Sequence, residues 1–175
     1  MLKKIKDPAS ALTHFAGCVM AALAAVPLLC KAAREPGRLY FIAMAVFALS
    51  MVLLYAASTT YHTVDSTDKV NRRLRKLDHM MIFVLIAGSY TPICLITLRG
   101  PQGTALCAAV WAVALAGIAI KALWITCPKW FSSVLYIAMG WLCVFAVVPI
   151  VNALSPAGFG WLLAGGIIYA ACFMR

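Results

Sequence analysis

Long runs of apolar residues alternate with short polar segments along the whole chain. Four uncharged runs cover residues 8–30, 39–61, 80–98 and 100–120, and a fifth covers residues 130–174. A helix needs about 20 apolar residues to cross the hydrocarbon core of a bilayer, so each of the first four runs has the length of one span. The runs lack the strict alternation of strands in an outer-membrane barrel. The pattern therefore predicts transmembrane helices.

The fifth run is too long for one span, because 45 residues would form a helix of about 67 Å. It contains Pro149, Asn152 and the segment 155–158, Ser-Pro-Ala-Gly, which is typical of a tight turn between helices. We therefore expect two spans here and six in all. The predicted fold is an all-α, polytopic transmembrane bundle forming a single domain, residues 1–175, with spans at about 9–30, 39–61, 79–98, 103–121, 131–151 and 158–174.

Composition agrees with this pattern. Hydrophobic residues make up 65% of the chain and charged residues 11%, with a mean hydropathy of +0.96. A soluble domain carries roughly 25% charged residues, so the composition excludes an ordinary soluble protein. The chain is expected to be an integral membrane protein whose surroundings are membrane lipids.

The basic residues predict an orientation. If the N-terminus is cytoplasmic, eleven of the fifteen Lys and Arg residues lie on the cytoplasmic side and four on the other. The positive-inside rule then favours a multi-pass protein of the cell (inner) membrane with its N-terminus in the cytoplasm. No basic domain is present to bind nucleic acid, so we expect no nucleic-acid partner. Residues 69–76 are expected to form a basic cytoplasmic loop that can contact lipid headgroups.

Candidate chemistry is concentrated where the second predicted span ends and the third begins. Ser58 and His62 are four residues apart and share a helix face, and Asp78 and His79 open the next span on the same membrane side. Polar groups near membrane depth are costly unless something binds them. Because imidazole and carboxylate are common zinc donors, the four residues suggest a metal site near the inner edge of the membrane.

Each of these residues also has a structural interpretation. Asp78 can cap the third helix, and Ser58 can bond to the carbonyl four residues earlier. His62 can be an interfacial histidine at the end of a span. His79 can face lipid headgroups, and His14 can lie at a helix interface. Spacing alone leaves these alternatives open.

The segment 56–92 resembles the signature of the haemolysin III family, relatives of the progestin and adipoQ receptors. The resemblance rests on Ser58-x-x-x-His62, on Arg-Lys-Leu-Asp-His at 75–79 and on Ala-Gly-Ser-Tyr-Thr-Pro at 87–92. The opening Ser-Ala-Leu-Thr-His at 10–14 is also similar, and the likeness extends over essentially the whole chain. It implies a seven-helix membrane protein with a cytoplasmic N-terminus.

The resemblance also implies a zinc ion inside the bundle near the cytoplasmic side. His62 corresponds to a direct zinc ligand, Asp78 to the residue that holds the zinc-bound water, and Ser58 to its neighbour. The wider superfamily includes alkaline ceramidases, which hydrolyse a lipid amide. A zinc-dependent hydrolase of a lipid amide or ester is thereby implied, with Asp78 and Ser58 as catalytic residues. Asp78 would orient or deprotonate the water, and Ser58 would anchor the water or the oxyanion.

One part of the family pattern is missing. The family's other two zinc ligands form a His-x-x-x-His pair in a seventh helix, whereas this chain has histidines only at 14, 62 and 79. A site with one family ligand is expected to hold zinc weakly. The chain can be a truncated product or fragment, which we favour, a protein whose partner supplies the seventh helix, or a member that has abandoned the metal.

Two other functions remain open. The family's name implies a membrane-perturbing or pore-forming protein, but no predicted span carries the charged stripe that would line a water-filled path. The third possibility is a receptor-like protein that senses lipid without turnover.

Overall fold

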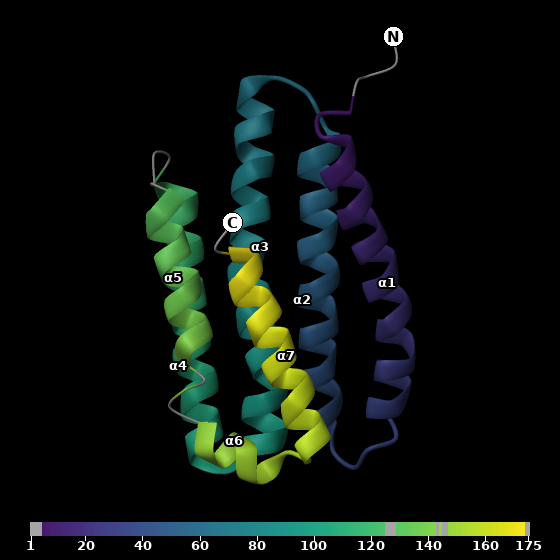
Figure 1. The fold of residues 1–175 in the computed structure, drawn as a ribbon, viewed down its shortest axis with the longest axis vertical. Helices are drawn as coiled ribbons and strands as arrows, with labels where there is room; N and C mark the ends of the chain where they lie inside the picture. The colour runs from purple at the N-terminus through teal and green to yellow at the C-terminus, as the bar shows by residue number, and fades with distance from the viewer. Residues whose placement is uncertain (1–4, 125–128, 143, 145–146, 174–175) are drawn as a thin grey trace.

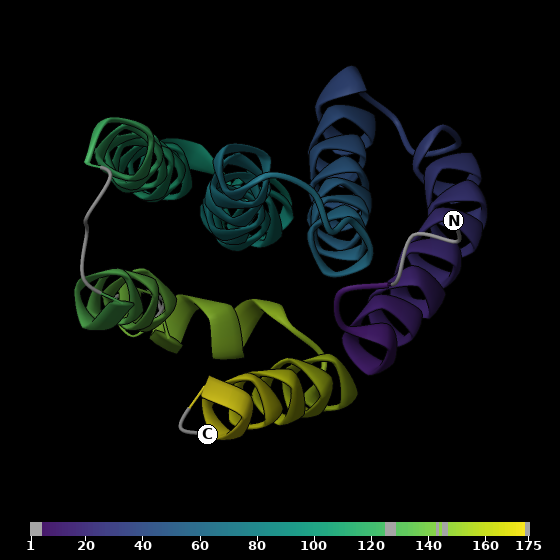
Figure 2. The same cartoon turned by 90° about the horizontal axis from the view of Figure 1, so that it is seen from above.

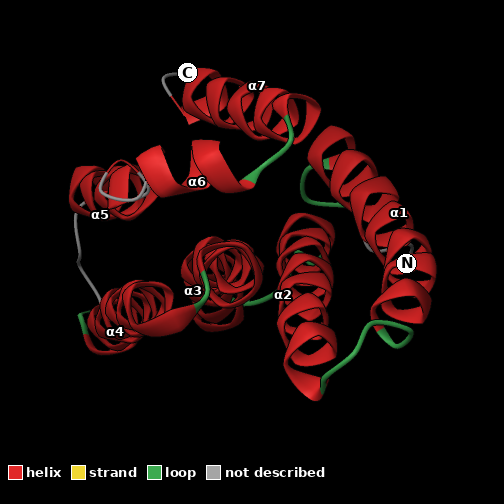
Figure 3. Ribbon diagram, turned by 90° about the horizontal axis from the view of Figure 1, so that it is seen from below, coloured by secondary structure: helices red, strands yellow, loops and turns green. Residues whose placement is uncertain are grey.

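The computed structural model describes residues 5–124, 129–142, 144 and 147–173, and these residues form helices and no strand (Figure 3). The all-α class is thereby confirmed. In chain order the elements are α1 (Pro8–Ala32), α2 (Arg38–Thr63), α3 (Asp68–Pro92), the π-helical segment η1 (Ile93–Leu98), α4 (Gly100–Leu123), α5 (Lys129–Trp141), α6 (Val147–Ala153) and α7 (Pro156–Phe173).

Helices α1 to α4 lie side by side in chain order, each packed against the next (Figures 1 and 2). Helix α3 continues directly into η1, and the two together are 31 residues long. Within the described residues, these four elements are long and apolar enough to cross a membrane, with hydropathy between 1.9 and 2.3. The first four predicted spans each coincide with one of them.

Within the described residues, three helices, α5, α6 and α7, lie along the last apolar run, residues 130–174. Helices α5 and α6 together cover most of the predicted fifth span, 131–151, and α6 lies across the end of the bundle (Figure 1). The expected turn before α7 is present, because Pro156 is the first residue of α7 and the Gly158 N–H donates to the Ser155 hydroxyl at 3.2 Å. The crossing of the membrane by the fifth and sixth segments stays a prediction.

Helix α3 begins earlier than the sequence suggested. The expected basic loop at 69–76 is helical, because the Thr67 side chain accepts a hydrogen bond from the Val70 N–H and Asp68 lies in the positively polarised first turn. The Arg, Lys and Leu residues that follow are good helix formers. Asp78 therefore lies ten residues inside the helix, and the interpretation that it caps the helix is wrong.

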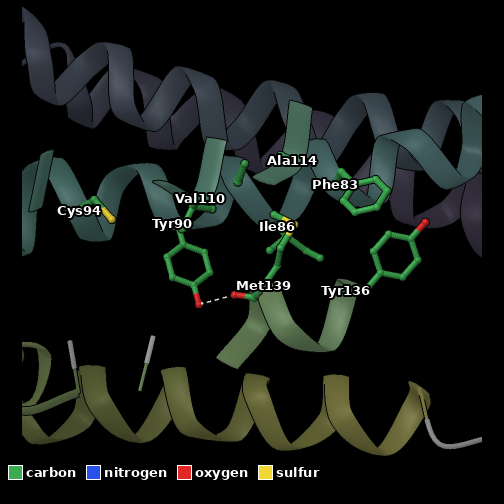
Figure 4. Close-up of a cluster of buried hydrophobic side chains, with 9 residues drawn as sticks. Phe83, Ile86, Tyr90, Cys94, Val110, Ala114, Tyr136 and Met139 are labelled. Atoms are coloured by element: carbon green, nitrogen blue, oxygen red, sulfur yellow. Dashed lines mark hydrogen bonds between the residues drawn. The ribbon is translucent and has the colours of Figure 1, made fainter. Parts of the chain in front are cut away.

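The main hydrophobic core joins α3, α4 and α5 (Figure 4). The rings of Phe83 and Tyr136 lie 4.6 Å apart, and the hydroxyl of Tyr90 donates to the backbone carbonyls of Met139 at 2.9 Å and Gly140 at 2.8 Å. These contacts attach α5 to α3. The buried residues of the core are Phe83, Ile86, Ala87, Tyr90, Cys94, Val110, Ala114, Tyr136 and Met139.

Glycines allow the long helices to approach closely. A Cβ atom at Gly88 of α3 would overlap the Ser50 side chain of α2, and one at Gly117 of α4 would overlap the ring of Phe83. Helix association in membranes depends on such small residues, because lipid removes most of the hydrophobic driving force. The close contact at Gly88 is made by the same two helices, α2 and α3, that carry the candidate site residues Ser58 and Asp78.

Candidate functional site

Ser58 and Asp78 meet between α2 and α3. The Ser58 hydroxyl donates a hydrogen bond to Oδ1 of Asp78, and both side chains are largely buried, with 5% of Ser58 and 13% of the Asp78 side chain exposed. Ser58 therefore bonds to a partner helix and not to the carbonyl four residues earlier. The structure brings the two predicted catalytic residues into direct contact.

His62 lies one helical turn further along α2, and the start of the chain holds it from two sides. Its Nδ1 lies 3.3 Å from Oδ2 of Asp7, and the Asp7 backbone N–H donates to the His62 carbonyl at 3.0 Å. The His14 ring of α1 stacks on the His62 ring, with centroids 5.3 Å apart and an interplanar angle of 23°. The His14 ring also lies near the Tyr55 ring of α2, with centroids 6.2 Å apart, so α1 packs beside this end of α2.

The contact with Asp7 distinguishes the two ring nitrogens of His62. A carboxylate only accepts hydrogen bonds, so it favours the neutral tautomer with the proton on Nδ1. The Nε2 atom then carries the free lone pair. Metal-binding histidines show this arrangement, since the nitrogen that does not face the metal almost always donates to a carboxylate, a carbonyl or water.

Asp7 is charged at neutral pH. It directly precedes α1, outside the membrane-spanning part of that helix. Polar contact with Ser10, reinforced by His62, holds the pKa of the Asp7 carboxyl below its ordinary value of 3.8. The positive end of the α1 dipole also favours an anion at this position.

His79 lies beside Asp78 but bonds to its own helix. Its Nδ1 is 2.7 Å from the Arg75 carbonyl oxygen, so Nδ1 is the donor, and the same atom is 3.7 Å from Oδ2 of Asp78. The Tyr136 hydroxyl donates to the His79 carbonyl at 2.8 Å. The backbone position of His79 is therefore linked to α5, and its side chain lies near one oxygen of Asp78 while bonding to the backbone of α3.

These residues fit a zinc site only in part. By donor type, the imidazole of His62 and the carboxylate of Asp78 match two of the groups that the family resemblance implies for zinc. Zinc sites normally use three or four protein ligands, and the described part of the chain holds no group of three or more His, Cys, Asp or Glu side chains that could hold a metal ion. The described residues alone do not complete a tetrahedral site.

Sequence reasoning did not assign a role at this site to Asp7 or His14. Their spacing carried a usable signal, because residues seven apart lie on one helix face two turns from each other. When a carboxylate comes just before a helix and a histidine follows two turns later, both groups can lie near the same end of a neighbouring helix.

Comparisons with known proteins agree on one family. A family model described as "Haemolysin-III related" matches residues 2–174. The chain is 40% identical to "Hemolysin-3" of Bacillus cereus over 165 residues, which cover 94% of this chain and 75% of that protein. It is 39% identical to "Hemolysin-3 homolog" of Bacillus subtilis (strain 168), again over 94% of this chain and 77% of that protein.

Proposed function

Because this chain belongs to the haemolysin III family of membrane proteins, we propose that Ser58, His62 and Asp78 form a site that activates water to hydrolyse the amide or ester bond of a membrane lipid. The observation that carries the proposal is the buried Ser58–Asp78 hydrogen bond one turn from an imidazole whose Nδ1 faces a carboxylate. In this proposal the protein lies in the cell (inner) membrane with its N-terminus in the cytoplasm, so the site acts on the cytoplasmic leaflet.

Asp78 is the general base in this reaction. It accepts a proton from a water molecule as the water oxygen forms a bond to the carbonyl carbon of the lipid. The carbon–nitrogen or carbon–oxygen bond then breaks, and the proton passes from Asp78 to the leaving amine or alcohol. Ser58 orients the carboxylate through the hydrogen bond that it donates to Oδ1. Once Asp78 has taken up the proton, the Ser58 hydroxyl can turn and donate to the oxygen that gains negative charge instead.

His62 would bind zinc through Nε2, and Asp78 would contact the zinc through a water. When bound, zinc lowers the pKa of water toward neutrality and polarises a carbonyl group. The remaining protein donors of such a site would come from outside the described residues, either from this chain or from a partner. Asp7 and His14 hold the imidazole of His62 in place in either case.

The test uses the full chain, purified in mild detergent and supplied with zinc and a fluorescent lipid amide. We expect His62→Ala and Asp78→Asn each to reduce turnover by roughly 10²- to 10⁴-fold. The matched control is His79→Gln, which removes an imidazole at the same end of the bundle and leaves Ser58, His62 and Asp78 intact. Its turnover is expected to stay within about fivefold of the wild type.

The same preparations separate hydrolysis from the alternatives. Turnover that survives both His62→Ala and Asp78→Asn would refute the proposed site. Dye leakage from liposomes that persists in both variants, without lipid turnover, would favour a membrane-perturbing protein. Lipid binding without product would favour a sensor.

A further inference from the structure

A hollow of about 290 Å³ lies at the end of the bundle where α2 leads into α3. The N-terminal segment lies at this same end (Figure 1). Three parts of the chain form the walls: the segment before α1, the end of α2 and the first two turns of α3. The lining residues are Lys6, Tyr61, Asp68, Asn71, Arg72 and Arg75.

The lining carries an excess of positive charge. Lys6, Arg72 and Arg75 are cationic and Asp68 is anionic, so the formal charge of the lining is +2. Across the described residues, none of the three cations forms an ion pair with a carboxylate; the two ion pairs observed are those of His62 and His79. Bringing unpaired like charges together is unfavourable, and a bound anion would relieve this repulsion.

One of the three cations is held in place, and all three have the chemistry of a phosphate site. The Lys6 Nζ atom lies 3.8 Å from the centroid of the Tyr61 ring, a cation–π contact that fixes it at the edge of the hollow. Arg72 and Arg75 are three residues apart in α3 and therefore lie on one helix face. The planar guanidinium group binds two phosphate oxygens at once, and an ammonium group adds a point charge.

The hollow also lies where the apolar helices give way to polar sequence. Tyr61 is in the last turn of α2, where aromatic side chains commonly mark the interface between lipid and water. Arg72 and Arg75 are in the polar first part of α3, before its apolar run begins. With a volume near the lower end of the usual range of about 300–1,000 Å³ for ligand pockets, the hollow suits a headgroup better than a whole lipid.

We propose that this hollow is a phosphate-binding pocket, filled by the phosphate of an anionic lipid headgroup or by a free phosphate ion. The pocket adjoins the candidate hydrolytic site, because the rings of Tyr61 and His62 are in edge contact with centroids 4.9 Å apart. Phosphate binding goes beyond the proposed hydrolysis and does not depend on it. A headgroup bound here would hold the lipid close to Ser58 and Asp78.

The experiment measures binding to the full chain in detergent by thermophoresis. Three probes are titrated separately: a short-chain phosphatidylglycerol, inorganic phosphate, and the matching short-chain diacylglycerol, which has no phosphate. We expect phosphatidylglycerol to bind at least tenfold more tightly than the diacylglycerol. Binding of the lipid alone identifies a headgroup pocket, and binding of both the lipid and inorganic phosphate identifies a pocket for the free anion as well.

Variants test whether the lining residues are responsible. Lys6→Gln, Arg72→Gln and Arg75→Gln are each expected to weaken phosphatidylglycerol binding fivefold or more. Arg73→Gln makes the same change in charge on α3 outside the pocket and is expected to alter binding less than twofold. Thermal unfolding of each variant checks that α3 is intact.

Two outcomes would overturn the proposal: equal binding of phosphatidylglycerol and diacylglycerol with no binding of inorganic phosphate, or an equal loss in Arg73→Gln and Arg72→Gln. The variant Asp78→Asn is expected to bind phosphatidylglycerol normally. The proposal of a phosphate pocket and the proposal of a hydrolytic site can thus be refuted independently of each other.

Discussion

Two groups of polar side chains lie among the same apolar helices, and they form different kinds of hydrogen bond. In the midhelix cluster, Tyr90, Thr91 and Trp111, the bonds run mainly to the backbone. The Tyr90 hydroxyl donates to the carbonyls of two α5 residues, and the Thr91 hydroxyl donates to the Ala87 carbonyl at 2.9 Å while accepting from Trp111 Nε1 at 3.0 Å. The cluster connects α3 to α4 and α5.

In the site cluster, Ser58, His62 and Asp78, side chains contact other side chains. Ser58 donates to Asp78, and His62 faces the carboxylate of Asp7. Carboxylate oxygens accept more than one hydrogen bond, and an imidazole with a proton on Nδ1 still has the lone pair of Nε2. The midhelix cluster uses its polar atoms to hold helices together, whereas the site cluster retains atoms that can bind a ligand. Polar side chains that stabilise this bundle can therefore be distinguished from those that are candidates for function by the atoms that their hydrogen bonds leave available.

The strongest test of the comparison is Asp78→Asn. An amide keeps the size of the carboxylate but cannot act as a base, so we expect turnover to fall by roughly 10²- to 10⁴-fold. The free energy of unfolding is expected to change by less than about 1 kcal/mol, because an amide oxygen can still accept the Ser58 hydrogen bond. Lipid turnover and unfolding in mild detergent measure the two effects. A large loss of stability with normal turnover would place Asp78 with the structural residues.

Gly88→Ala is expected to weaken the contact between α2 and α3. The added Cβ would overlap the Ser50 side chain, whose hydroxyl donates to the Phe47 carbonyl at 2.7 Å. Overpacking of this kind typically costs about 1–3 kcal/mol. Because the same helix pair carries Ser58 and Asp78, turnover is expected to fall together with stability. Denaturant unfolding in detergent and lipid turnover check both results.

The matched control for this change is Gly165→Ala in α7, where a Cβ would meet no atom within 4 Å. Alanine there is expected to be neutral or slightly stabilising, because it favours helix over the flexible unfolded chain. Equal losses at both glycines would show that the close approach at Gly88 is unimportant.

Tyr90→Phe tests the midhelix cluster alone. The variant loses the hydroxyl that bonds to Met139 and Gly140, so we expect stability to fall by about 0.6–1.7 kcal/mol, the range found for hydrogen bonds between membrane helices. Turnover is expected to stay near the wild-type value. Tyr40→Phe, at the start of α2, is the control and should leave stability unchanged. A fall in turnover larger than the fall in stability would mean that the two clusters are coupled.

The sequence predicted the elements that depend on local patterns and missed those that depend on packing. Apolar run length located the four long helices, and Ser155 with Pro156 marked the turn before α7. Helical periodicity and topology placed Ser58 and Asp78 near each other. The helical conformation of residues 69–76 was missed because the basic residues were interpreted as a loop that sets the orientation. The signal was present, since Val70, Leu74 and Leu77 recur at helical spacing and Thr67 is a suitable N-cap.

Other features could not be read from one stretch of sequence. The division of residues 131–151 into α5 and α6 accompanies contacts of α5 with α3, through Tyr90 and Tyr136, that link distant parts of the chain. The approach of Asp7 and His14 to His62 likewise needs the antiparallel packing of α1 on α2.

The Asp7 contact gives the smallest expected effect and the most specific signature. Asn at position 7 can both donate and accept, so Asp7→Asn is expected to loosen the preference of His62 for a proton on Nδ1, and Asp7→Glu is expected to restore it. Histidine ¹⁵N spectra report the tautomer directly, and the chain contains only three histidines, which His→Gln variants can assign.

Stability supplies a second readout for Asp7. Because the folded-state pKa of this carboxyl lies below its ordinary value of 3.8, its stabilisation is present above that pH and is lost as the pH falls through the lowered pKa. The difference in stability between wild type and Asp7→Asn is therefore expected to be full at neutral pH and to shrink as the pH falls below 3.8 through the lowered pKa. Identical ¹⁵N spectra in all three proteins would mean that Asp7 does not orient His62, and the imidazole would then depend on its ring contacts with His14 and Tyr61.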